Sequence, residues 1–161
     1  MLEARSVEKF KQDVVVIPGA RPFLEALSAS SALWAIVTSG TEPGTNGWIE
    51  TFNLPGPDGL VAAESVTGGE PDPTCYQMGL SKLGLQDQAA QVLVLEDSPA
   101  GIKSGNAANC KALAVVATHS MEQIMAAGPD WIVKDLDSIK VVGKVEGRIV
   151  VEISDVLWRR G

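Results

Sequence analysis

The chain has 161 residues, and its 13 Lys+Arg against 20 Asp+Glu give a formal net charge of −7. With 45% hydrophobic residues and no long polar tract, the composition is that of a folded chain rather than a disordered one. The apolar runs are shorter than the roughly 18–20 residues that a membrane span needs. The acidic balance includes no basic stripe, so we expect neither nucleic acid nor a membrane surface as a partner.

The charged start of the chain, residues 1–10, lacks the apolar stretch of a signal peptide, which predicts a cytoplasmic protein. Cys75 and Cys110 show no metal-ligand spacing, and two reduced, buried thiols are expected in that compartment. A single histidine, His119, excludes a multi-histidine metal site. No repeat or linker divides the sequence, so we expect one domain over residues 1–161.

Short β-branched runs alternate with helix-like stretches, which predicts an α/β fold with a mostly parallel sheet. The expected extended or strand segments are residues 14–17, 34–37, 60–63, 91–95, 111–116, 131–133 and 148–153. Helices are expected with Pro22 in a first turn, and over residues 74–83, 100–109 and 121–127.

In an open parallel sheet, ligands bind outside the carboxyl ends of the strands. This rule gathers four loops at one edge of the predicted sheet, namely residues 38–41, 68–73, 96–99 and 117–120. The polar side chains of these loops are the candidate site residues: Thr38, Ser39, Glu70, Glu96, Asp97, Ser98 and His119.

Two adjacent carboxylates, Glu96 and Asp97, follow a strongly apolar strand. Charges in that place are costly unless they bind a cation or accept hydrogen bonds. Mg²⁺ is the natural cation, because it prefers carboxylate and water oxygens. In the alternative interpretation, Asp97 only caps the following helix and Glu96 faces water.

Thr38, Ser39 and Gly40 also follow a strand, where a hydroxyl and backbone N–H groups can bind an anion. The alternative is a tight turn that uses the conformational freedom of glycine. For His119, a role as a base stands beside that of a solvated or hydrogen-bonded loop side chain.

Four segments carry a family resemblance: residues 34–41 (Trp-Ala-Ile-Val-Thr-Ser-Gly-Thr), 70–73 (Glu-Pro-Asp-Pro), 92–102 (Val-Leu-Val-Leu-Glu-Asp-Ser-Pro-Ala-Gly-Ile) and 127–135 (Ala-Gly-Pro-Asp-Trp-Ile-Val-Lys-Asp). Together they resemble the haloacid dehalogenase-like (HAD) superfamily, and within it the glycerol-phosphate and deoxysugar-phosphate phosphatases. The resemblance extends from Val14 to about Val142 and implies a Rossmann-like core.

In the family that the chain resembles, a nucleophilic aspartate and an acid/base aspartate two residues later lie on the first, central strand. The resemblance implies that Thr38 hydrogen-bonds the phosphoryl group and that Glu96 and Asp97 help to hold Mg²⁺. In the same pattern, a lysine in a Gly-Lys-Pro-Asp-Pro loop neutralises developing charge, and a helical cap domain selects the substrate.

The sequence departs from that pattern in two places. No Asp-x-Asp strand precedes Val14, so we expect a truncated HAD-like core without the first strand and without most of the cap, starting at what resembles the last cap helix. Glu70 stands at the position of the lysine. At an effective dielectric constant near 20, a unit-charge pair about 4 Å apart is worth about 4 kcal/mol, so this charge reversal is large.

From these departures we expect that phosphatase chemistry is lost and that the chain, if an enzyme, is a non-hydrolytic lyase, isomerase or cyclase. Its substrate would be a non-phosphorylated small molecule. Glu70, Asp97 and, as a second base, His119 would transfer protons in an isomerisation, cyclisation or dehydration. The substrate-binding side chains would be Thr38, Ser39, Glu96 and Ser98. No cofactor is expected, and Mg²⁺ would bind only weakly at Glu96 and Asp97.

Two alternatives remain open. One is a non-catalytic pseudoenzyme that binds a partner, and the other is a fragment of a Mg²⁺-dependent glycerol- or sugar-phosphate phosphatase. A missing strand leaves an unpaired sheet edge, which is an aggregation hazard unless something covers it. We therefore expect a homodimer, or a partner chain that covers the missing strand.

Overall fold

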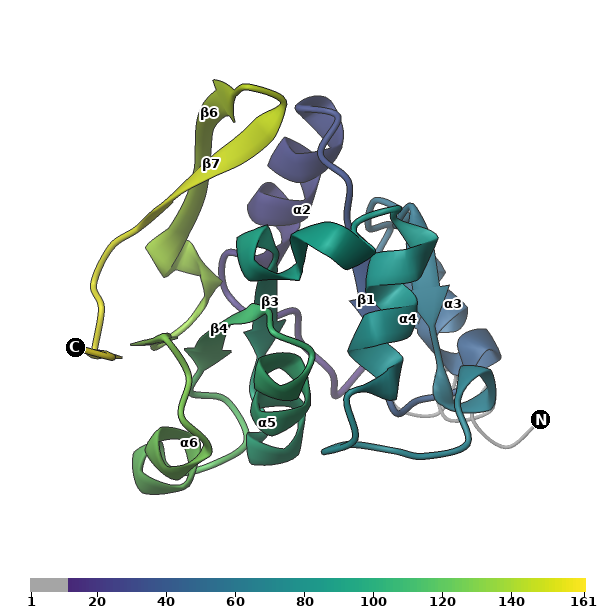
Figure 1. Cartoon of the computed structure of the whole chain (residues 1–161). Helices are drawn as coiled ribbons and strands as arrows, with labels where there is room; N and C mark the ends of the chain where they lie inside the picture. Colours follow the sequence, from purple (N-terminus) through teal and green to yellow (C-terminus); the bar gives the residue numbers. More distant parts are fainter. Residues whose placement is uncertain (1–11) are drawn as a thin grey trace.

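The computed structural model describes residues 12–161, in which helices and strands alternate (Figure 1). The α-helices are α2 (Ala20–Ala29), α3 (Glu42–Thr51), α4 (Thr74–Lys82), α5 (Pro99–Ala107) and α6 (Met121–Ala127). The strands are β1 (Ala35–Val37), β2 (Gly59–Val61), β3 (Leu93–Glu96), β4 (Lys111–Val115), β5 (Trp131–Val133), β6 (Ile139–Val145), β7 (Arg148–Ile153) and β8 (Trp158–Arg159). Three 3-10 turns connect them within this range: η1 (Ala63–Ser65), η2 (Gln86–Gln91) and η3 (Leu136–Ser138).

Between residues 12 and 161 the strands pair in three groups. β1 and β2 are parallel, with Ala35 opposite Gly59. β3, β4 and β5 are also parallel, with Leu113 of β4 opposite Leu95 of β3 and Trp131 of β5, and β8 joins β5 antiparallel. β6 and β7 form an antiparallel hairpin beside α2 (Figure 1). The expected α/β fold with a mostly parallel sheet is confirmed.

The parallel sheet is divided between β1 and β3. In the described residues β1 pairs only with β2, and β3 pairs only with β4. Each of these strands therefore has one long edge whose backbone N–H and C=O groups have no strand partner in that range. We call the free edges of β1 and β3 the open rims.

Helices cover both faces of β4, and its side chains alternate between two apolar clusters. Ala112 and Ala114 face the cluster of α5 and α6, which contains Ile102 and Ile124. The alternate residues Leu113 and Val115 pack with Phe23 of α2 and with the β6–β7 hairpin. All of these residues are between 0% and 7% exposed, so α5 is anchored firmly beneath the loop that joins it to β3.

Most of the predicted elements are present. Residues 121–127, 131–133 and 148–153 coincide with α6, β5 and β7, and the helices expected over 74–83 and 100–109 correspond to α4 and α5. The strand expected at 91–95 begins only at Leu93, because the preceding residues form η2. The segment at 34–37 becomes β1, yet it is half-buried rather than buried, as suits a strand beside an open rim.

Other elements were missed, and one predicted segment is wrong. Residues 14–17 form no strand, and Val15 is 83% exposed. Helix α3 contains two glycines and a proline, but Thr41 caps it by accepting a hydrogen bond from the Gly44 amide at 3.3 Å. β6 was missed although Glu146 and Gly147, both with positive φ, form the tight turn that a hairpin requires.

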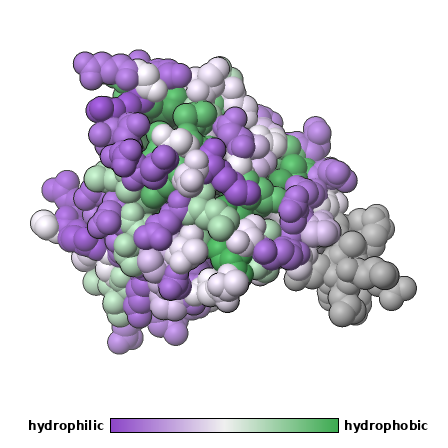
Figure 2. Space-filling model, turned by 45° about the vertical axis from the view of Figure 1, so that its right-hand side comes forward, coloured by the Kyte–Doolittle hydropathy of each residue, from purple (hydrophilic) through white to green (hydrophobic). Residues whose placement is uncertain are grey.

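The surface of the described range carries apolar side chains in separate patches among polar ones, as Figure 2 shows for one face. None of its helices is long and apolar enough to cross a bilayer. Cys75 and Cys110 are buried and free, which confirms the expected thiols. The expectations for the charged start and for the last cap helix fall outside the described residues.

Candidate functional site

Three strands bring their carboxyl ends to one edge of the fold. Thr38 follows β1, Glu96 ends β3, and Thr118 and His119 follow β4. Because β3 and β4 are parallel neighbours, the loops that follow them meet at the same edge, as predicted.

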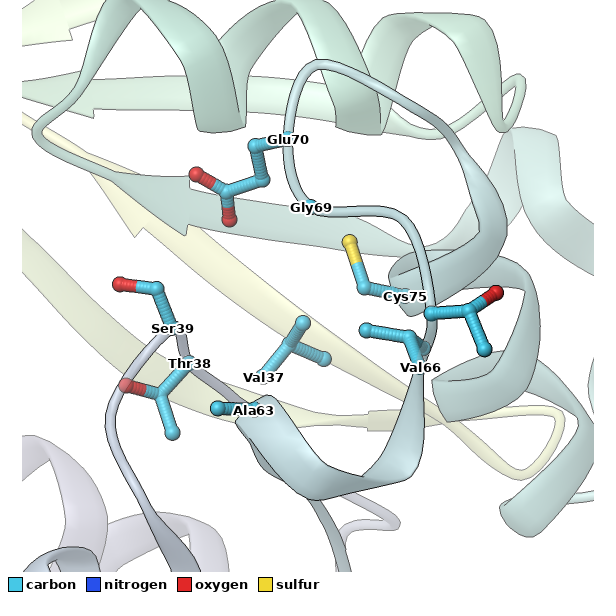
Figure 3. Close-up of a pocket in the computed structure, with 9 residues that line it drawn as sticks. Val37, Thr38, Ser39, Ala63, Val66, Gly69, Glu70 and Cys75 are labelled. Carbon is cyan, nitrogen blue, oxygen red and sulfur yellow. The ribbon is translucent and has the colours of Figure 1, made fainter.

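A pocket of about 250 Å³ lies at this edge, between the loop after β1 and the loop before α4. Its lining residues are Val37, Thr38, Ser39, Ala63, Val66, Thr67, Gly69, Glu70 and Cys75. Figure 3 shows the Glu70 carboxylate and the Ser39 hydroxyl turned toward the same space, with Val37 and Cys75 on its apolar side. Thr38, Ser39 and Glu70 are therefore brought together as predicted.

Thr38 has a geometry suited to an anion. Its Oγ1 accepts a hydrogen bond from the Gly40 amide at 3.0 Å, which fixes the turn after β1. A hydroxyl has one proton to donate and two lone pairs, so this bond leaves the Thr38 proton for a ligand in the pocket. The tight-turn and anion-site interpretations are thus compatible at this residue.

Glu70 brings a carboxylate into a negatively charged neighbourhood. Burial raises its pKa above the ordinary value of 4.5, and the nearby carboxylates of Glu96 and Asp97 raise it further. The carboxylates of this group therefore repel one another. This repulsion makes the charged form of Glu70 costly, and it reduces the negative charge that Glu70 carries in mildly acidic solution.

Glu70→Gln is expected to stabilise the fold at neutral pH and to lose this advantage in acid. The folded protein holds the Glu70 proton to a higher pH than the unfolded chain does, so the wild type is fully stabilised only below about pH 4.5. As the pH rises through the raised pKa, that contribution disappears in the wild type but not in the variant. Thermal unfolding of both proteins between pH 4 and pH 8 tests this, and melting temperatures that differ by the same amount throughout would contradict it.

Glu96 accepts four hydrogen bonds and is turned into the protein. Its Oε1 accepts from the Tyr76 hydroxyl at 2.7 Å. Its Oε2 accepts from the amides of Asp97 and Ser98, each at 3.0 Å, and from Ser98 Oγ at 3.1 Å. The carboxylate also lies directly over Gly101, where a Cβ would stand 2.1 Å from Oε1. The interpretation that Glu96 simply faces water is therefore wrong, because α5 and Tyr76 of α4 close over it.

Gly101→Ala is expected to destabilise the protein by about 2 kcal/mol or more. The added methyl group displaces the Glu96 carboxylate, and hydrogen bonds to a charged group contribute about 1.5–3 kcal/mol each. Urea unfolding measures the loss. Gly56→Ala is the matched control, because a Cβ at Gly56 meets nothing within 4 Å. Equal stability of the two variants would contradict the expectation.

Asp97 and His119 are connected through a residue that the sequence did not single out. Thr118 Oγ1 donates to Asp97 Oδ2 at 2.6 Å and lies 2.9 Å from His119 Nδ1. The Thr118 hydroxyl has a single proton, which goes to Asp97, so Nδ1 of His119 must be the donor in the second bond. His119 is not among the residues that line the pocket.

Ser98 is first of all a helix cap. Its hydroxyl accepts a hydrogen bond from the Gly101 amide at 2.9 Å and donates one to Glu96, so both its donor and an acceptor site are already used within the fold.

Ser104 and Tyr76 were missed by the sequence analysis, although both are buried polar groups that need partners. Ser104 donates to the Asp72 carbonyl at 2.6 Å and ties α5 to the loop that carries Glu70. The sequence could have indicated these two residues, because a tyrosine and a serine on the inner faces of adjacent helices need hydrogen-bond partners.

The described residues do not form a Mg²⁺ site by themselves. Over residues 12–161, no three His, Cys, Asp or Glu side chains converge in a way that could hold a metal ion. Glu96, one of the two positions implied by the family resemblance, already accepts four hydrogen bonds. The donor set within residues 12–161 thus does not fit the ion.

Residues 2–115 match the family of haloacid dehalogenase-like hydrolases. The chain is 35% identical over 146 residues to glycerol-1-phosphate phosphohydrolase 1 of Saccharomyces cerevisiae, covering 87% of this chain and 58% of that protein. It is 34% identical to hexitol phosphatase A of Escherichia coli, covering 88% of this chain and 63% of that protein. The chain thus spans about three fifths of the length of these curated relatives.

A solved structure agrees on the fold. CbbY from Rhodobacter sphaeroides, in complex with xylulose-(1,5)bisphosphate, matches with a TM-score of 0.74 at 19% identity, covering 83% of this chain and 60% of that chain. This likeness supports the Rossmann-like core.

The relatives overturn the expectation that phosphatase chemistry is lost. Curated relatives that match most of this chain are phosphatases, which contradicts both a repurposed lyase, isomerase or cyclase and a binding-only pseudoenzyme. The expectation gave decisive weight to one charge at Glu70. That carboxylate is half-buried with a raised pKa, and Thr38 still presents its hydroxyl to the pocket. The phosphatase alternative is the one that the relatives favour.

Proposed function

Because this chain belongs to the haloacid dehalogenase-like hydrolases, we propose that it is the phosphate-handling part of a phosphatase for small phosphorylated polyols or sugars. The observation that carries the proposal is the identity of 35% with a glycerol-1-phosphate phosphohydrolase over 87% of the chain. The pocket supports it, since about 250 Å³ is small and suits a phosphoryl group with a short carbon chain.

The reaction is hydrolysis of a phosphate monoester, in which water is consumed and an alcohol and inorganic phosphate are released. Within this scheme the Thr38 hydroxyl donates a hydrogen bond to a phosphoryl oxygen and orients the phosphoryl group at the end of β1. The two aspartates that the family pattern requires would come from a strand between the open rims. The carboxyl end of such a strand, parallel to β1 and β3, would reach the edge where Thr38 and Asp97 lie.

The open rims also suggest what assembles with the chain. A strand from a longer form of the same polypeptide, or from a second copy, would satisfy the backbone groups of β1 and β3 together. Sedimentation of the 161-residue chain is expected to show a homodimer or larger species. A stable monomer at micromolar concentration would remove the second copy as the source of that strand.

The location that we propose is the cytoplasm. Its support is that Cys75 and Cys110 are free and buried in the fold, as suits a reducing compartment.

The proposal is tested by phosphate release from glycerol 1-phosphate and hexitol phosphates. The assay uses the chain and, where its gene encodes more residues, the longer product. Thr38→Val is expected to lower kcat/KM about 10-fold to 100-fold, because a donor to the phosphoryl group is lost. Ser81→Ala, an exposed hydroxyl deletion on α4, is the matched control and should not change kcat/KM. Failure of the longest product to release phosphate from any of these esters would overturn the proposed function.

A further inference from the structure

The four hydrogen bonds of Glu96 leave its carboxylate little capacity for anything else. A carboxylate offers about four lone-pair sites, and Glu96 receives one donor on Oε1 and three on Oε2. Gly101 of α5 packs directly against one side of the Glu96 carboxylate, and a Cβ at this position would clash with it. The carboxylate therefore lies at the N-terminal end of α5, where negative charge is favourable.

Tyr76 completes this arrangement from the neighbouring helix. Its ring is buried, with 8% exposure, and its hydroxyl donates to Glu96 Oε1 at 2.7 Å. Burial, followed by the charge of Glu96, raises the pKa of Tyr76 above its ordinary value, so the hydroxyl stays protonated and remains a donor. Ser104 makes a second link between the same two parts of the fold by donating to the Asp72 carbonyl.

The hydrogen bonds to Glu96 also restrain the backbone at Asp97. Its own amide and the amide of Ser98 both donate to Glu96, so the backbone on either side of the Asp97 side chain is held in place. The Asp97 carboxylate accepts from Thr118, and it lies close enough to Glu70 to raise the pKa of that group.

We propose that Tyr76 and Glu96 are positioning residues: Glu96 fastens the β3–α5 loop to α4, is not available to a cation, and thereby holds the backbone on both sides of Asp97. This fastening rests on the contacts alone and not on the proposed function.

The first measurement is amide hydrogen exchange in the full chain. Tyr76→Phe removes one hydroxyl and keeps the ring, so it is expected to speed exchange at the Asp97 and Ser98 amides about tenfold. Glu96→Gln should do the same, because its amide group presents N–H to donors that need an acceptor. Ser81→Ala on the same helix should leave both rates unchanged. Wild-type exchange at both amides in Tyr76→Phe would overturn the positioning role, even if Glu96→Gln does not fold.

The second measurement is Mn²⁺ binding by electron paramagnetic resonance, with the metal alone. Glu96→Gln is expected to keep the Mn²⁺ affinity of the wild type within about threefold, and an immeasurable affinity in both proteins agrees with this. Measurable binding in the wild type that is abolished by Glu96→Gln, with unchanged amide exchange, would overturn the inference. Neither measurement depends on turnover, so the positioning role and the proposed phosphatase can fail separately.

Discussion

Glu70→Lys is expected to tighten the binding of orthophosphate to the chain by more than tenfold. Glu70 lines the same pocket as Thr38 and Ser39, so its charge acts directly on an anion bound there. A unit-charge pair about 4 Å apart is worth about 4 kcal/mol at an effective dielectric constant near 20, and 1.4 kcal/mol is a factor of ten in affinity. Isothermal titration calorimetry at low ionic strength measures the change.

Two further measurements separate charge from shape. Glu70→Gln should give an intermediate affinity, because it removes the repulsion without adding attraction. Raising the salt concentration should reduce the differences in orthophosphate affinity between the wild type and the two variants, since screening weakens the interaction of partly exposed charges. If all three proteins bind orthophosphate equally well, Glu70 does not act on the anion and the assignment of this pocket is wrong.

Ile102→Ala is expected to lower the free energy of unfolding by about 2–5 kcal/mol. Ile102 is 0% exposed and lies on the inner face of α5, in one cluster with Ile124 and Ile132, so truncation leaves a cavity that the neighbouring side chains cannot fill. For a chain of this size the loss corresponds to a decrease of about 5–15 °C in melting temperature. Differential scanning calorimetry provides the measurement.

Met125→Ala is the matched control for Ile102→Ala. Met125 lies on the adjacent helix α6 and is 40% exposed, and alanine is a good helix former. Its substitution should cost less than about 1 kcal/mol. A comparable loss in both variants would mean that the cluster of α5, α6 and β5 does not dominate the stability of the fold.

Hydrophobic patterning was sufficient for the buried parallel strands and the helices between them. The run before Glu96 and the run from Lys111 to Val115 are apolar on both faces, which is the pattern of a strand covered by helices. The pattern could not distinguish residues 14–17 from a strand, because a short apolar run does not show whether a neighbour is present to pair with. Helix α3 depends on its cap at Thr41 and not on its helix propensity, so a prediction based on helix propensity misses it.

For the site, the sequence predicted which loops meet but not which contacts their side chains make. Topology alone placed Thr38, Glu96 and Asp97 at one edge. The inward position of Glu96 includes a contact with Tyr76, a residue 20 positions earlier, and that contact is a product of the packing of α4 on α5. The link from Asp97 through Thr118 to His119 likewise needs two loops that come together only in the folded chain.

Within residues 12–161, the divided sheet has two strand edges without a strand partner, one on β1 and one on β3. Together they form a template for an added extended peptide, which would hydrogen-bond to both edges at once. A separately synthesised peptide of suitable pattern should complement the chain in trans. In concentrated solution without such a peptide, the same edges would favour ordered fibrils over amorphous precipitate.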